Sequence, residues 1–123
     1  MATLEDVRRI AASLPDAEGA ADGTWRVDGK LFAWPWMERV DPRRARVPNR
    51  DVLVVRVADE LEKQSLIQLD PETFFTEPHY DGYAAVLVRL PAVETELLEK
   101  LITDAWRLRA PRIRPSRRDS TRK

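Results

Sequence analysis

The sequence predicts a two-layer α+β domain in which helices pack on one face of an antiparallel sheet. The apolar pattern runs helix, hairpin, strand, helix, strand, helix, which is not a series of β-α-β units. A chain of 123 residues with 43% hydrophobic residues can bury one core. We therefore expect a single domain over residues 1–111 and a basic, disordered tail over residues 112–123.

The first helix is expected over residues 3–14. Thr3 is a candidate N-cap, with Asp6 three residues later as a shorter relative of the capping-box glutamate. Apolar residues then repeat at helical spacing until Pro15 stops the pattern. Residues 16–24 contain two glycines and no periodicity, so this stretch is predicted to be a loop.

A hairpin follows, and its turn is the strongest local signal in the sequence. Asp28 and Gly29 are suited to the positive φ angles of a two-residue turn between two runs of strand-forming residues. In the second strand Phe32, Trp34 and Trp36 fall on one face by a period of two. Packing in the core is the favoured interpretation of this row, and a stacking platform for bases is the alternative.

The remaining elements can be placed from periodicity and helix signals. Asp59 is a candidate N-cap, Pro71 and Pro111 end helices, and Phe74 and Phe75 are expected to insert into the core. The sheet face without helices should carry Arg56 or Arg89 and part of the aromatic set. The expected order is an arginine-rich loop over 37–50, a strand over 51–57, a helix from 59, a strand from 84 and a helix from 93.

The net charge of zero hides a charge split. From Arg107 onward there are eight basic residues and one acidic residue, against 13 basic and 20 acidic residues before it. Such a split is typical of an arm that binds nucleic acid, although a basic tail can also be a merely solvated segment. The candidate phosphate-contacting residues form two clusters: Arg39, Arg43, Arg44, Arg46 and Arg50, and then Arg107, Arg109, Arg112 and Arg114.

Few residues here are suited to catalysis. The chain has no cysteine and one histidine, and its four glycines form no phosphate-binding pattern, so we expect no metal site, no cofactor and no catalytic residues. His79 precedes an Asp81-Gly82 turn and is interpreted as a structural residue that holds the loop. The chain starts without a signal-peptide pattern and has no apolar run of about 20 residues, so a cytoplasmic protein without membrane contact is expected.

Three stretches carry a family resemblance: GKLFAW, DPETFFTEPHYDGYAAVLVRL and AWRLRAP. Together they resemble the MmcQ/YjbR family of small bacterial proteins, from the first helix to about Pro111. The resemblance implies a fold similar to that of the frataxin-like CyaY proteins and a DNA-binding role inferred from a double-wing shape, with no catalytic set. Two functions follow: a non-catalytic DNA-binding protein that contacts phosphates through its arginine clusters, or a small-ligand or protein-binding module that uses the aromatic face of the sheet.

Overall fold

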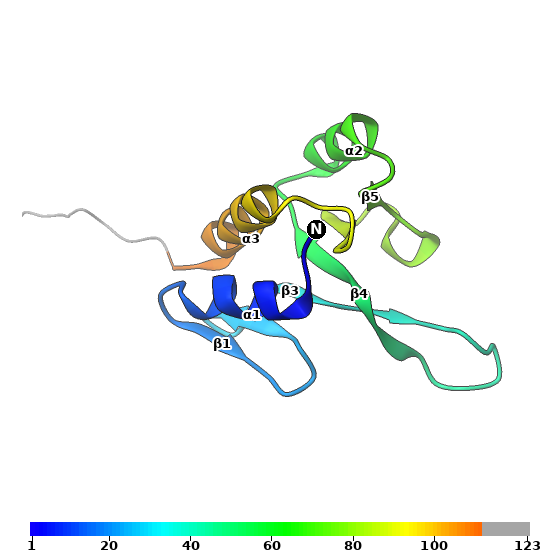
Figure 1. Cartoon of the computed structure of the whole chain (residues 1–123), viewed down its shortest axis with the longest axis horizontal. Coiled ribbons are helices and arrows are strands. Elements are labelled where there is room, and N and C mark those ends of the chain that lie inside the picture. The colour runs from blue at the N-terminus through cyan, green and yellow to red at the C-terminus, as the bar shows by residue number, and fades with distance from the viewer. Residues whose placement is uncertain (112–123) are drawn as a thin grey trace, which may run out of the picture.

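The computed structural model describes residues 1–111 and shows one twisted sheet with three α-helices (Figure 1). All strand pairs are antiparallel, and the strand order is β1-β2-β3-β4-β6-β5. The α+β prediction is therefore confirmed. The elements are α1 (Leu4–Ala12), β1 (Ala17–Gly19), β2 (Trp25–Val27), β3 (Lys30–Glu38), β4 (Val47–Arg56), α2 (Glu60–Leu69), β5 (Phe74–Phe75), the 3-10 helix η1 (Pro78–Tyr80), β6 (Ala85–Arg89) and α3 (Thr95–Arg109).

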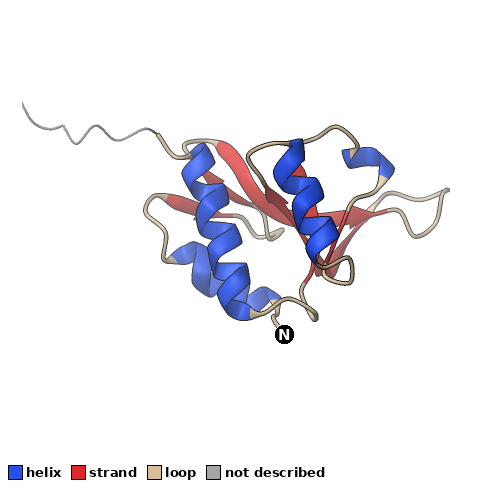
Figure 2. Cartoon of the chain, turned by 90° about the horizontal axis from the view of Figure 1, so that it is seen from above, coloured by secondary structure: helices blue, strands red, loops and turns tan. Residues whose placement is uncertain are grey.

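The three α-helices lie on the same side of the sheet, with α1 beside α3 (Figure 2). We call this side the inner face and the opposite side the outer face. The inner core joins alternate residues of the central strands to the apolar sides of the helices, which is the packing that a two-layer domain requires. Its fully buried members include Phe32, Leu53, Val55, Phe74, Val86, Val88, Leu98 and Ile102.

Helix α1 begins with the predicted cap. The carboxylate of Asp6 accepts a hydrogen bond from the backbone N–H of Thr3 at 2.9 Å. This bond is the main reason that the pKa of the Asp6 carboxyl is lowered, and the hydrogen bond from Arg9 is the second reason. Asp59 likewise accepts from the Glu62 backbone N–H at 2.9 Å and starts α2.

The predicted aromatic row on β3 is split between the two faces. Trp25 of β2 lies opposite Ala33 while Arg26 lies opposite Leu31, which leaves Phe32 as an extra residue in a β-bulge. Because a bulge breaks the alternation of side chains, Phe32 joins the inner core, whereas Trp34 and Trp36 pack on the outer face. The expectation that all three share one face is wrong.

The outer face has a small core of its own. Buried Val54 and Leu87 from the central strands meet Tyr80 of η1, which folds over this side of the sheet. The indole Nε1 of Trp34 donates to the hydroxyl of Tyr80 at 3.1 Å, and Phe75 packs edge-on against Trp36. Of the two predicted core phenylalanines, Phe74 lies in the inner core and Phe75 on the outer face.

A buried lysine connects α2 to the turn that follows η1. The side chain of Lys63 is 1% exposed, and its Nζ donates to the backbone carbonyls of Tyr80 at 2.6 Å and Tyr83 at 3.1 Å. The turn closes on Asp81 and Gly82, as predicted, because Gly82 has a φ of 75° and the Tyr83 N–H donates to the Tyr80 carbonyl. Lys63 thus fixes the segment that covers the outer core.

Two strand boundaries differ from the sequence-based expectations. Residues 17–19, expected within a loop, form the edge strand β1, in which Glu18 lies opposite Arg26. The predicted loop over 37–50 is shorter, since Glu38 lies opposite Val47 and Met37 opposite Pro48. This extension is a two-stranded ribbon that projects beyond the sheet (Figure 1). Because the ribbon covers no core, its strands lack the alternation of apolar and polar residues by which a strand is predicted.

Candidate functional site

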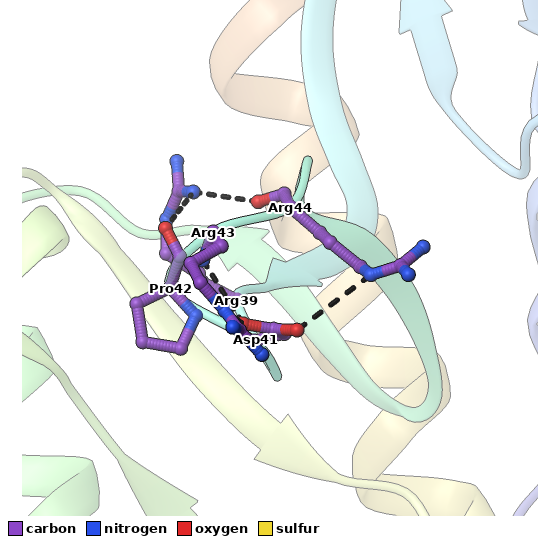
Figure 3. Close-up of polar contacts among 5 residues, drawn as sticks. All are labelled: Arg39, Asp41, Pro42, Arg43 and Arg44. Atoms are coloured by element: carbon purple, nitrogen blue, oxygen red, sulfur yellow. Dashed lines mark hydrogen bonds and ion pairs between the residues drawn. The ribbon is translucent and has the colours of Figure 1, made fainter.

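The β3–β4 hairpin carries the first predicted arginine cluster, and three of its members, Arg39, Arg43 and Arg44, lie at the turn (Figure 3). The Nη1 of Arg39 donates to the backbone carbonyls of Arg44 at 2.7 Å and Pro42 at 3.4 Å. The carboxylate of Asp41 accepts from the backbone N–H of Arg43 at 3.0 Å and lies 3.6 Å from the Nε of Arg44. Arg39 and Asp41 therefore shape the tip of the hairpin.

Three arginines of this cluster keep their charged groups in solvent. The side chains of Arg43 and Arg44 are 89% and 82% exposed, and Arg50 is exposed at the base of the hairpin. Arg46 differs, because it is half-buried and donates to the carbonyl of Met37 at 3.0 Å. The predicted cluster thus divides into two arginines that brace the hairpin and three that are open to a partner.

The second predicted cluster is far from the first. Arg107 and Arg109 are at the C-terminal end of α3, whereas the β3–β4 hairpin reaches the opposite end of the molecule in both views (Figures 1 and 2). Arg112 and Arg114 lie outside the described residues. Helix α3 and the hairpin extend in opposite directions from the sheet, so the described arginines of the two clusters do not form one surface.

Arg109 lies with three cations that are not among the predicted phosphate-contacting residues. Arg26 of β2, Lys30 of β3 and Arg56 of β4 line the same pocket as Arg109, which has a volume of about 400 Å³. These residues are isolated in the sequence, so no charge run marks them. The available signal was the period-two pattern of β4, which placed Arg56 on the open side of the sheet.

The aromatic residues of the outer face are largely engaged with one another. Trp34, Trp36, Phe75 and Tyr80 form the small outer core, and Trp34 also lines a cleft of about 250 Å³ with Leu31 and Met37. Arginines lie over rings at the margin of this cluster. The guanidinium of Arg56 is 4.8 Å from the Tyr83 ring centre, and that of Arg89 is 4.0 Å from the ring centre of Phe75.

His79 lies at the surface of η1. Its side chain is exposed, and its ring packs edge-on against Tyr80 with centres 4.9 Å apart. The His79 side chain forms no hydrogen bond with the described part of the chain. Asp81, Gly82 and Lys63 hold this loop instead, so the loop-holding role assigned to His79 is wrong.

Residues 1–111 contain neither a cluster of metal-binding side chains nor a membrane-spanning helix. Within them, no group of three or more His, Asp or Glu side chains is arranged to hold a metal ion. No helix of this part of the chain combines the length and the apolar character needed to cross a membrane.

Comparison with known proteins places these features in a family. The YjbR family model matches residues 12–108. An uncharacterized protein of Mycobacterium tuberculosis, Rv2570, is 46% identical over 118 residues, which cover 91% of this chain and 92% of the relative. The Mycobacterium bovis protein Mb2600, also described as uncharacterized, matches to the same extent.

A solved structure shares the fold. The crystal structure of Deinococcus radiodurans protein DR2400, a DUF419 domain, superposes with a TM-score of 0.66 at 22% sequence identity. The match covers 88% of this chain and 78% of the other. At this level of identity the likeness concerns the fold alone.

Proposed function

This chain belongs to the YjbR family, and we propose that it is a non-catalytic DNA-binding protein whose β3–β4 hairpin contacts backbone phosphates. The observation that carries the proposal is the exposed charge of this hairpin. Residues 39–50 contain five arginines and a single carboxylate, and they lie on a ribbon that projects beyond the sheet (Figure 1). A projecting, positively charged hairpin can follow a phosphate backbone without requiring the rest of the domain to approach it.

The contacts of the hairpin arginines suggest two roles, one structural and one in phosphate binding. Arg39 and Arg46 hold the ribbon through backbone carbonyls. Arg43, Arg44 and Arg50 are exposed, and the ion pairs of the first two with Asp41 are weak because both arginine side chains are in solvent. A phosphate can replace Asp41 as their partner, since a guanidinium forms paired hydrogen bonds with phosphate oxygens.

The charge of the remaining chain supports a local contact. The residues before Arg107 contain 20 acidic and 13 basic residues, so duplex DNA would be repelled by much of the domain. Binding through a few phosphates carries no base information, and the expected affinity is therefore similar for unrelated sequences.

The alternative, a ligand-binding module on the aromatic face, has less support. Trp34 and Trp36 already pack against Tyr80 and Phe75 and are half-buried, so only part of each ring is left for a ligand. The exposed arginines have no comparable partner within the described residues other than Asp41.

A fluorescence titration of labelled duplex DNA at several salt concentrations tests the proposal. The full chain is compared with Arg43→Gln/Arg44→Gln/Arg50→Gln and with a chain ended at Pro111. Each lost phosphate contact should reduce the slope of log affinity against log salt by about 0.9, so the triple variant should lose up to about 2.7. The loss should be the same for two duplexes of unrelated sequence.

A matched control removes three charges from the helical side of the domain. Arg8→Gln/Arg9→Gln/Lys100→Gln alters exposed residues of α1 and α3 and should leave the salt slope unchanged. Undetectable binding by the full chain at low salt would disprove the proposal. An equal loss in the control variant would show that net charge, and not the hairpin, determines binding.

A further inference from the structure

A second cationic site lies at the opposite end of the molecule from the hairpin. The β2–β3 turn, the last residue of β4 and the end of α3 meet there around a pocket of about 400 Å³. Four of its described lining residues are cations and none is acidic. The lining side chains used below are Arg26, Lys30, Leu31, Arg56, Tyr83 and Arg109.

The positive charge of this pocket is not balanced by ion pairs within residues 1–111. Hydrogen bonds from Thr24 lower the pKa of the Asp22 carboxyl, and the charge of Arg26 adds to this effect without a direct contact. None of the four cations forms an ion pair with a described carboxylate. Glu18 lies opposite Arg26 in the strand register, and it too forms no ion pair with that arginine. Like charges held in one pocket repel each other, and a bound anion would offset this repulsion.

Arg109 gives an independent indication of a missing partner. Its Nε is buried and has no hydrogen-bond partner in the described part of the chain. Buried donors in native proteins are nearly always paired, and a water or an ion can satisfy one that has no protein partner. In a pocket lined by three other cations, an anion is the partner that satisfies both the donor and the charge.

The side chains also have a preferred arrangement. Arg56 lies over the Tyr83 ring at 4.8 Å, which restricts the plane of its guanidinium group. Three guanidinium groups and one ammonium group suit an anion with several oxygens and more than one negative charge. The volume of about 400 Å³ accommodates a small phosphorylated molecule.

We propose that this pocket binds the phosphate or diphosphate group of a small molecule. This function goes beyond the proposed DNA contact, because it uses none of the hairpin arginines. A monoanionic phosphodiester of DNA would neutralise less of the pocket charge than a terminal phosphate or diphosphate would.

The test is a calorimetric titration of the full chain with inorganic pyrophosphate. Saturable binding with a single site is expected, together with a rise in the melting temperature. Arg56→Gln and Arg109→Gln should each weaken the affinity about tenfold, since each removes a hydrogen bond to a charged group. Lys30→Gln, at an exposed position that should not affect folding, should weaken it about twofold to fivefold.

Arg89→Gln is the matched control. Arg89 also lies over an aromatic ring on the outer face, but it does not line this pocket, and the pyrophosphate affinity should be unchanged. The proposal is overturned if the folded full chain shows no saturable binding, or if Lys30→Gln and Arg56→Gln both bind as the unmodified chain does.

Competition separates the two sources of phosphate. Duplex DNA added to the pyrophosphate complex should not displace the ligand, and the pocket variants should keep the salt slope of DNA binding. Displacement by DNA, with the same variants weakening both ligands, would assign the pocket to phosphodiesters and reject the small-molecule ligand. If the hairpin variant bound DNA as the unmodified chain does, only the DNA proposal would be rejected, because the pocket contains none of the hairpin arginines.

Discussion

The two faces of the sheet bury their aromatic residues in different ways. On the inner face Phe32 and Phe74 are completely buried between the strands and the helices. On the outer face Trp34, Trp36 and Phe75 remain half-buried, and the guanidinium of Arg89 lies over the Phe75 ring at the surface. The inner face can therefore supply most of the stability, while the outer face and the sheet ends carry the charged groups that are open to partners.

One strand contributes to both environments. The bulge in β3 turns Phe32 inward, and Trp34, two residues later, faces outward. The contrast between the faces can therefore be tested with substitutions only two positions apart in the sequence.

The largest expected effect is on the inner face. Phe32→Ala should reduce the free energy of unfolding by about 3–5 kcal/mol, because the truncated ring leaves a cavity in a core that cannot fully collapse. Urea denaturation of the variant and the unmodified chain measures this loss. A loss below about 1 kcal/mol would show that the inner core does not dominate stability.

Trp34→Ala tests the outer face and should have a smaller effect. Because the ring is half-buried, we expect a loss of about 2 kcal/mol, which includes the hydrogen bond from its Nε1 to Tyr80. The same denaturation experiment, with Phe32→Ala as the reference, gives the difference. If Trp34→Ala were the more destabilising variant, the ranking of the two faces would be reversed.

The smallest effect is expected at the surface of the outer face. His79→Gln should change the free energy of unfolding by about 0.5 kcal/mol or less, because the exposed ring only packs edge-on against Tyr80. Thermal denaturation checks the stability, and the DNA titration described above checks binding. A folded variant that had lost DNA binding would give His79 a functional role.

The sequence predicted elements wherever a strong period met a clear boundary. The Asp28-Gly29 turn, the Asp59 cap and the amphipathic α3 all depend on residues that are close together in the sequence. The bulge at Phe32 and the edge strand β1 depend on pairing with a neighbouring strand, which local patterns do not contain. A strict alternation therefore assigned Phe32 to the wrong face.

The candidate sites show the same limit. The exposed arginines of the hairpin form a cluster within 12 consecutive residues, 39–50, which the sequence alone reveals. The pocket at the end of α3 was not visible, because Arg26, Lys30 and Arg56 come from three strands and meet only in space. Predicting it would have required the strand order as well as the positions of the strands.

The exposed tip of the β3–β4 hairpin also offers trypsin a cleavage site within the folded domain. Trypsin cleaves after arginine, and Arg43 and Arg44 lie at a solvent-exposed turn, whereas much of the sheet is protected by pairing and burial. A cut in this turn leaves β3 paired with β4, with Trp34 opposite Val54 and Glu38 opposite Val47. The two fragments should therefore stay together as a nicked, folded complex, and bound DNA should slow the cleavage by covering the same arginines.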